Sequence, residues 1–349
     1  VWGLAEHISR TERRIHRAGG AMAGEFACRS QDELVGGGEA MSGFRNRLRQ
    51  VAEHDVATLI HGPQGTPLAA AARWLHVSSN RRDAAFVPVN CCGCSESQLL
   101  VRIFGHGSGA FPGADSAEPS AMAVAGRGSV LIHGLEHAHR SVQERILEMM
   151  RDGEWRSIGS HIARPLISRI IVTLHRAPLQ AIMEGSLYRD LLDRLSGHIV
   201  RMPSLLDRSE DIPDLMSHYL TQAAAAMGRR RPTVEPDLAS ALVRARWIGQ
   251  DRELELVCER LVLSAVERNL CAADVEGWLA QPGSRESGEG LVCTGDKTLA
   301  DVERSVILAT LRAHNGHRRR SAAALGIGVR TLGLKLRRWK DAAIVPETV

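Results

Sequence analysis

The sequence has no long apolar run. No stretch approaches eighteen uninterrupted apolar residues, the length at which a membrane-spanning helix becomes a candidate. The amino-terminal segment VWGLAEHISRTERRIHR carries charges throughout, rather than a charged start followed by an apolar core, so it does not resemble an export signal. We therefore expect a soluble, cytoplasmic chain. Its 349 residues and 44% hydrophobic content are enough for about two or three compact domains.

The sequence also lacks a pair of CxxC motifs, the spacing that indicates a zinc ribbon or a disulfide framework. The seven cysteines are an odd number, and we expect reduced thiols. They are Cys28, Cys91, Cys92, Cys94, Cys258, Cys271 and Cys293. Adjacent thiols in the 91–94 cluster can share a soft metal, but a tetrahedral site needs a fourth ligand, and cysteine is commonly a small core residue. We expect no bound metal.

Acidic residues are missing from one segment near the carboxyl end. From Arg304 to Lys340 there are ten Lys or Arg and no Asp or Glu, whereas the whole chain is nearly balanced at a net charge of +4. Such a local concentration of positive charge predicts an anionic partner. Double-stranded DNA is the leading candidate.

Composition separates the chain into five segments. Residues 1–33 form a polar amino-terminal extension that is too short for a domain of usual size. Apolar runs then alternate with helical stretches, which predicts an α/β fold with a doubly wound, mostly parallel sheet. The runs are VATLI (56–60), SVLI (129–132) and RIIVTL (169–174). The later segments are an α/β block (34–227), a helical portion (228–280), a Gly- and Ser-containing linker (281–297) and a small helical domain (298–349).

The loop after VATLI has the position of a phosphate-binding P-loop but not its residues. A strand, a loop and a helix-like AAAARWLH place backbone N–H groups where they can hold an anion. The motif requires GxxxxGK[ST], and Pro67, Leu68 and Ala69 occupy its last three positions. They remove one N–H donor, the phosphate-binding cation and a magnesium ligand. We expect no tight ATP binding; the nucleotide-binding positions are Gly62, Gly65, Thr66, Pro67 and Leu68.

The strand SVLI is followed by His133 and Gly134, where a nucleotide hydrolase carries one carboxylate for magnesium and one for the attacking water. A neutral imidazole and a hydrogen atom cannot replace two carboxylates. We therefore regard both as degenerate catalytic positions and expect hydrolysis to be absent or very slow.

A zinc peptidase is a remote alternative at the same place. Residues 133–137 match HxxEH, an inverted zinc-peptidase signature in which both histidines bind zinc from one helical face. His133 directly follows a strand, and Gly134 weakens a helix. This context favours the nucleotide-site interpretation, since short motifs match often by chance.

Eight short segments identify a family when they are taken in order. Residues 105–114 read GHGSGAFPGA, and the core GAFPGA differs at one position from GAFTGA. The segments are LVGGGEAM, FVPVNCCG, GAFPGA, VQERILEMMRDGEWRSIG, RIIVTLH, LYRDLLDRLS, MPSLLDRSEDIPDL and WIGQDREL. With these segments in this order, the chain resembles the AAA+ ATPase domain of the NtrC family of sigma-54-dependent transcription activators, joined to a Fis-type helix-turn-helix, over about residues 34–340. The resemblance implies an AAA+ sheet with a helical lid, ATP and Mg²⁺ as cofactors, and sigma-54 RNA polymerase as a partner.

The resemblance also implies roles for individual residues. His175 falls at a nucleotide sensor, and Arg252 at the lid arginine that responds to the nucleotide. Arg194 matches one of two arginine fingers that reach a neighbouring subunit's ATP site, and Tyr188 replaces the other. Pro112 stiffens the sigma-factor contact loop. That loop comprises Gly109, Ala110, Phe111, Pro112, Gly113 and Ala114.

The carboxyl segment has helix-turn-helix spacing. Residues 298–314 predict an amphipathic helix suited to pairing with a second copy. A short helix (318–325), a glycine turn (326–328) and a third helix (329–339) follow, and the third would enter the DNA major groove. We expect Arg330 and Thr331 at base edges or nearby phosphates. Phosphate contacts are expected from Arg318, Arg319, Arg320, Lys335, Arg337 and Arg338.

Three functions stay open. The first is a DNA-binding transcription regulator whose AAA+ block is an oligomerisation and interaction scaffold, with the chain binding paired half-sites as a homodimer. The second is an ATP-hydrolysing activator of sigma-54 polymerase, working as a ring. The third is a regulatory subunit that inserts into rings of an intact activator and supplies Arg194. The residues at the P-loop and after SVLI count against the second.

Overall fold

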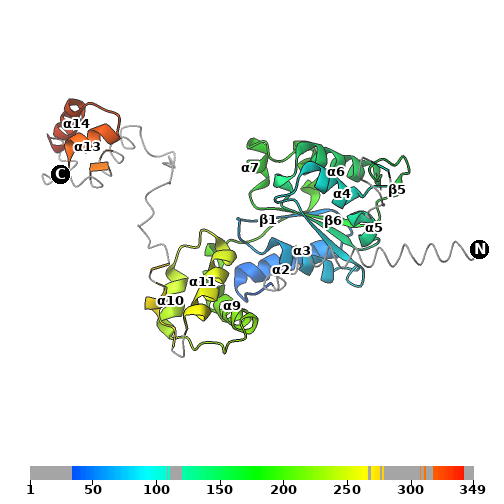
Figure 1. Cartoon of the computed structure of the whole chain (residues 1–349), viewed down its shortest axis with the longest axis horizontal. Coiled ribbons are helices and arrows are strands. Elements are labelled where there is room, and N and C mark those ends of the chain that lie inside the picture. The colour runs from blue at the N-terminus through cyan, green and yellow to red at the C-terminus, as the bar shows by residue number, and fades with distance from the viewer. Residues whose placement is uncertain are drawn as a thin grey trace, which may run out of the picture. The chain divides into compact units, whose positions relative to one another are not determined.

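The structure is a computed structural model and describes residues 34–107, 109–110, 120–265, 269–275, 277–278, 307, 310–311 and 317–341. The chain divides into two compact units, residues 1–282 and 283–349, which are drawn in Figure 1. Each unit has its own apolar core. Within the described ranges, no helix has the length and apolar character needed to cross a membrane.

The first unit is built on a parallel five-stranded sheet with the order β2-β3-β6-β1-β7. Its strands are β1 (Thr58–His61), β2 (Phe86–Asn90), β3 (Ser129–His133), β6 (Arg169–Leu174) and β7 (Ile199–Arg201). Parallel neighbours need crossover connections, which the intervening helices provide. The central strand β6 is buried along all six of its residues, as expected for a strand covered on both faces. All three apolar runs that predicted strands lie in this sheet, which confirms the predicted fold class.

Helices cover both faces of the sheet (Figure 1). Because successive strand residues point to opposite faces, Ile60 packs with α2 and α3 on one face while Leu59 faces the other helices. The helices of the first face are α2 (Glu39–Ala52) and α3 (Leu68–Val77). Those of the second are α4 (Glu96–Phe104), α5 (Ala121–Ala125), α6 (Arg140–Asp152), α7 (Pro178–Met183) and α8 (Arg189–Leu195). A short hairpin, β4 (Glu154–Trp155) with β5 (Arg164–Pro165), and two 3₁₀ turns, η1 (Leu135–His137) and η2 (Ser196–His198), complete the block.

A helical lid follows the sheet. It contains η3 (Leu206–Asp211), α9 (Ile212–Ala226), α10 (Pro236–Arg244), α11 (Gln250–Ser264) and η4 (Ala272–Asp274). The sequence-based boundary at 227/228 assigned α9 to the α/β block. In the structure, the buried side chains of α9 pack with those of α10 and α11 in a separate core. The lid therefore begins before residue 228, because the apolar face of α9 is matched by helices that follow it.

The second unit pairs α13 (Arg318–Ala324) with α14 (Val329–Asp341). Gly326, with φ +64°, lies in the turn between them, and its positive φ suits glycine. The core is formed by Ile307, Leu311, Ala322, Leu332 and Leu336. Most of the helix expected over 298–314 lies outside the described residues, although 307, 310 and 311 are helical.

Candidate functional site

The loop between β1 and α3 is closed by its own hydrogen bonds. The Gly62 amide donates to the Leu174 carbonyl at 3.1 Å, which continues the pairing of β1 with β6. The Thr66 amide and hydroxyl both donate to the Pro63 carbonyl, at 3.2 and 2.7 Å. Pro67 precedes α3 and brings no N–H. The Thr66 hydroxyl, which lies just before α3, thus donates its hydrogen bond within the turn.

Leu68 is the first residue of α3, and its side chain is fully buried. It belongs to the core between α2, α3 and the sheet, where burial of a leucine contributes about 2 kcal/mol. In this orientation the side chain at position 68 faces the core, and the loop receives no cation from it.

The lid contacts this loop through backbone atoms. The Arg252 amide at the start of α11 donates to the Gly65 carbonyl at 3.1 Å. A Cβ on Gly65 would lie 2.1 Å from the Gly249 carbonyl oxygen, and Gly65 has φ +92°. Only glycine fits between the loop and α11. The Arg252 guanidinium forms an ion pair with Glu255 at 2.6 Å, directed along its own helix.

A buried ion pair fixes the start of α11. Arg208 of η3 donates from Nη2 to both carboxylate oxygens of Asp251, at 2.7 and 2.6 Å. The two side chains are only 1% and 4% exposed. Burial raises the pKa of Asp251, and the nearby Arg208 opposes that shift. Removing one partner from such a pair leaves an uncompensated buried charge, so the loss of either side chain is expected to destabilise the lid.

The lid is also tied to α2. The Gly38 amide donates to Asp211 Oδ1 at 2.7 Å, and the Glu39 amide donates to Glu210 Oε1 at 2.8 Å. Both carboxylates belong to η3 and meet the amino terminus of α2, where negative charge is favourable. Neither these contacts nor the Arg208 pair follows from a local sequence pattern, because the partners lie far apart along the chain.

His133 and His175 lie together where β3 and β6 end. Their rings are 4.9 Å apart between centroids in an edge-to-face arrangement, and His133 Nδ1 lies 2.7 Å from Thr173 Oγ1. Burial, together with His175 and His137, lowers the pKa of His133 to about 3. The His175 amide donates to the buried carboxylate of Glu136 at 2.7 Å. The structure therefore brings the predicted sensor position beside the predicted degenerate catalytic position, and adds Glu136 to them.

The HxxEH segment does not form the helix that a zinc peptidase requires. His133 ends β3, Gly134 has φ +68°, and His137 ends the 3₁₀ turn η1. The two histidines therefore do not share one turn of an α-helix. In the part of the chain that the structure describes, no group of three or more His, Cys, Asp or Glu is placed to hold a metal ion.

The cysteines near this edge have weakly acidic thiols. Cys91 is fully buried, and burial raises its pKa to about 12. The Cys92 residue is exposed overall, but partial desolvation of its thiol and the nearby Glu136 carboxylate raise its pKa too. Thiolates, the form that binds metals, are disfavoured at both positions.

Arg194 lies at the other end of the sheet. It is exposed on α8 and donates from Nη2 to the Met150 carbonyl at 2.9 Å. It lines a cavity of about 420 Å³ together with Val56 and Arg169, which precede β1 and begin β6. The P-loop position and the two histidines follow the carboxyl ends of the strands. The predicted finger is therefore not part of the same chain's loop site.

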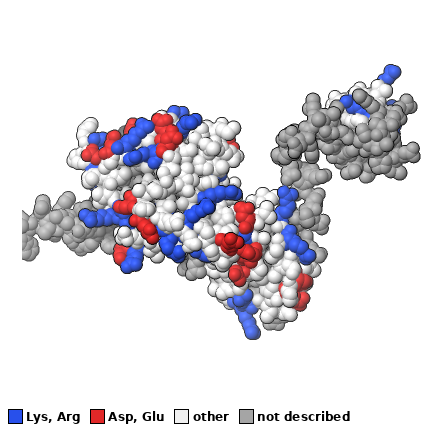
Figure 2. Space-filling view, turned by 180° about the vertical axis from the view of Figure 1, so that it is seen from behind, with Lys and Arg blue, Asp and Glu red and all other residues white. Residues whose placement is uncertain are grey.

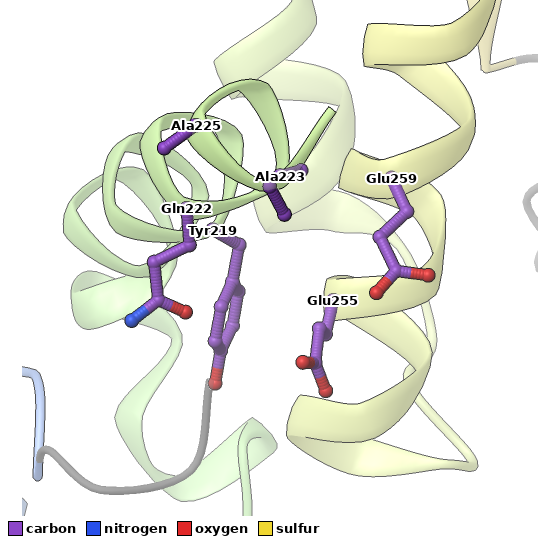
Figure 3. Close-up of a pocket in the computed structure, with 7 residues that line it drawn as sticks. Tyr219, Gln222, Ala223, Ala225, Glu255 and Glu259 are labelled. Carbon is purple, nitrogen blue, oxygen red and sulfur yellow. The ribbon is translucent and has the colours of Figure 1, made fainter. Parts of the chain in front are cut away.

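The lid contains a cavity of about 350 Å³ between α9 and α11 (Figure 3). Glu255 and Glu259 of α11 face Tyr219 and Gln222 of α9 across it. Two carboxylates disfavour a phosphate group here. No predicted contact residue lines this cavity, which is separate from the loop after β1.

Only the start of the predicted sigma-factor loop lies within the described residues. Gly109 has φ +78°, and the Ala110 amide donates to the Gly107 carbonyl at 3.3 Å. A Cβ on Gly159 would lie 2.9 Å from Ala110 Cβ, so the loop starts in close contact with that segment. Phe111, Pro112, Gly113 and Ala114 lie outside the described residues.

Five of the predicted DNA contacts are exposed on α13 and α14. The cationic run of Arg318, Arg319 and Arg320 is exposed, as are Arg330 and Thr331, whereas Lys335 is partly buried. The structure does not describe the side chains of Arg337 and Arg338. On the face of the first unit drawn in Figure 2, basic and acidic side chains are interspersed. In the second unit, the exposed arginines belong to a stretch of sequence, from Arg304 to Lys340, that contains no Asp or Glu.

Comparison with protein-family models matches three consecutive segments. Residues 34–201 match the sigma-54 interaction domain, residues 206–289 the AAA+ ATPase lid domain, and residues 298–339 the bacterial regulatory proteins of the Fis family. The transcriptional regulatory protein ZraR of Salmonella typhimurium is 32% identical over 315 residues, which is 89% of this chain and 70% of ZraR. The chain belongs to the NtrC and ZraR family of sigma-54-dependent transcription regulators. The lid model begins at residue 206, in agreement with the packing of α9 in the lid.

One further relative supports this membership, and one solved structure supports the fold. The DNA-binding transcriptional regulator NtrC of Escherichia coli K12 is 28% identical over 326 residues, covering 87% of this chain and 70% of NtrC. The crystal structure of NtrX from Brucella abortus in complex with ADP superimposes with a TM-score of 0.65 at 23% identity, over 96% of this chain and 72% of NtrX. At that identity the NtrX structure shows the shared fold.

Proposed function

We propose that this chain is a cytoplasmic DNA-binding transcription regulator whose AAA+ block acts as an oligomerisation and interaction scaffold, with impaired ATP binding and hydrolysis. The observation that carries the proposal is the complete burial of Leu68 at the start of α3, where a P-loop supplies the lysine for the terminal phosphates. Sigma-54 polymerase is the expected protein partner by family membership.

Three further features support impaired nucleotide chemistry. The Thr66 hydroxyl is bonded within its turn, and the lid amide of Arg252 already bonds the loop carbonyl of Gly65. At the end of β3, a neutral imidazole and a glycine offer no carboxylate for magnesium or for an attacking water. A bound nucleotide would therefore lack the P-loop lysine, the hydroxyl at position 69 and the two carboxylates expected after β3, while the nearby Glu136 carboxylate already accepts the His175 amide.

The test uses the purified full chain. Calorimetric titration with Mg·ATP, together with phosphate release, is expected to show neither saturable binding nor turnover. Fluorescence anisotropy with duplex DNA is expected to show binding that weakens steeply with salt. Replacing Arg318, Arg319 and Arg320 by alanine should weaken it further. ATP turnover that disappears in Arg252→Ala would overturn the scaffold proposal and support the motor.

Insertion into rings of an intact activator is a second candidate, favoured by one observation. Arg194 is exposed at the amino end of the sheet, apart from the chain's own loop, so it is available to an adjacent subunit. Mixing the chain with an intact relative should then change the relative's ATPase rate, and Arg194→Ala should abolish that change. No co-assembly on size exclusion would contradict it.

A further inference from the structure

One apolar side chain stands on an otherwise polar face of α14. Leu332 and Leu336 are buried in the core of the second unit, while Arg330, Thr331 and Leu334 are exposed. Leu334 follows Arg330 by four residues and Thr331 by three, so the three side chains share one side of the helix. The leucine is 61% exposed, in the middle of the face predicted to meet DNA.

The surroundings leave the Leu334 side chain accessible. It is not a member of the apolar cluster that holds α13 against α14. A Cβ on the neighbouring Gly333 would meet no described atom within 4 Å, so the adjacent surface is open. Packing among the described residues of this unit therefore gives no reason for a leucine at position 334.

The exposed cations of α13 and α14 favour nucleic acid over an apolar protein surface as the partner of this unit. Arg330 lies on the same face, and Arg318, Arg319 and Arg320 are exposed on α13. Such cations attract phosphates and place a helix in register on the duplex. In the major groove, the apolar feature of thymine is its C5-methyl group, which distinguishes it from the other bases.

We propose that Leu334 reads thymine, by packing against the C5-methyl group in the major groove beside the contacts of Arg330 and Thr331. The inference rests on the proposed DNA-binding function and deepens it by naming the base that this position selects. In a homodimer, each copy would contact one half-site and read one thymine within it.

The experiment begins with the full chain and a library of random duplexes, from which bound sequences are selected and sequenced. In a selected duplex, each thymine is then replaced by deoxyuridine, which removes only the methyl group. At one thymine in each half-site, this replacement is expected to lower the affinity of the chain for the duplex about fourfold, since burial of a single methyl group is worth that factor. Replacing it in both half-sites should lose about fifteenfold, because separated positions add.

The side chain responsible is identified by variants of this exposed position. Leu334→Ala should bind the thymine and deoxyuridine duplexes equally, at the affinity of the wild type for deoxyuridine. Leu334→Gln should move the preference at that position toward adenine, which glutamine bonds bidentately. Val329→Ala is the matched control, because Val329 is 45% exposed on the same helix but lies about 140° away around its axis. It should keep the full thymine preference.

The outcomes separate the two proposals. Failure to select any duplex would contradict the DNA-binding function itself, and the reading of thymine with it. Selection without a methyl effect, or with a methyl effect that persists in Leu334→Ala, would contradict only the role of Leu334. A change of oligomeric mass in Leu334→Ala, measured by light scattering, would assign this side chain to a subunit contact and also contradict the inference.

Discussion

The loop after β1 and the exposed face of α14 are the two places where the sequence predicts phosphate contacts, yet their side chains are placed differently: they are buried or bonded within the turn at the loop, and exposed on α14. At the loop, Leu68 is buried in the core and the Thr66 hydroxyl bonds its own turn. On α14, Arg330 and Thr331 are exposed. The comparison indicates that the apolar core around the loop forms without the polar side chains that a phosphate site requires. At the loop the side chains serve packing and turn formation, whereas on α14 they are accessible to a ligand.

The largest effect is expected at the buried ion pair between η3 and α11 of the lid. Arg208→Met should lower the free energy of unfolding by about 3–5 kcal/mol, because Asp251 is left buried and unpaired. Urea unfolding of the full chain measures this. The double variant Arg208→Met with Asp251→Leu should recover most of the loss.

The control for that pair is Arg252→Ala. Its ion pair with Glu255 is partly exposed and should cost at most about 1 kcal/mol. Equal losses for Arg208→Met and Arg252→Ala would contradict the view that the buried pair fixes the lid.

Restoring the P-loop cation should destabilise the block. Leu68→Lys is expected to lower the free energy of unfolding by about 3 kcal/mol, because it removes apolar burial and brings an ammonium group into a core. The same urea experiment measures the loss, and Mg·ATP titration is expected to stay flat. A variant that gains ATP affinity at unchanged stability would show that position 68 faces the loop.

Filling the gap between the loop and the lid should have a smaller effect. Gly65→Ala is expected to cost about 2 kcal/mol, from its positive φ and from the contact with the Gly249 carbonyl. Gly93→Ala is a matched control, because Gly93 also has a positive φ but nothing lies within 4 Å of its Cβ position. It should cost about 1 kcal/mol. Equal costs would mean that the lid does not contact the loop in solution.

Acid should weaken the first unit through His133. Its pKa in the folded state is lowered to about 3 from 6.5, so below pH 6.5 the unfolded chain binds a proton that the folded chain does not. The contribution of neutral His133 to the free energy of unfolding is complete above pH 6.5. It is lost as the pH falls towards 3, by up to about 1.4 kcal/mol per pH unit. Thermal or urea unfolding at pH 7.5, 6 and 5 measures the slope. His133→Gln should have a shallower slope, and an unchanged slope would contradict the assignment.

The smallest effect on stability is expected in the second unit. Arg319→Ala should change the free energy of unfolding by less than about 0.5 kcal/mol, since the side chain is exposed. It should reduce the slope of log affinity for duplex DNA against log salt by about 1. A stability loss as large as that of Gly65→Ala would remove the contrast between the two units.

The sequence predicts best where local patterns agree with the tertiary structure. The runs VATLI, SVLI and RIIVTL are apolar and β-branched, and all three lie in the sheet. The turn before α14 follows from Gly326. The order of motifs then identifies the family, because each short segment is weak alone but their spacing is specific.

The remaining features depend on partners that are distant in the sequence. Arg208 and Asp251 resemble ordinary surface charges until α11 is placed beside η3. Glu136 is predicted only as part of a zinc motif, whereas its carboxylate accepts the His175 amide from the neighbouring strand end. The apolar face of α9 predicts that the helix is packed against other elements, but it does not indicate which core these elements form. Pattern reasoning detects a face or a charge, but it cannot name the opposing element.

The most direct test of the central claim is calorimetric titration of the purified full chain with Mg·ATP, followed by measurement of phosphate release on the same sample. We predict no saturable heat and no release above the buffer rate, in a sample that still binds duplex DNA. Saturable binding with steady phosphate release, lost in Arg252→Ala, would contradict it and identify the chain as a working ATPase.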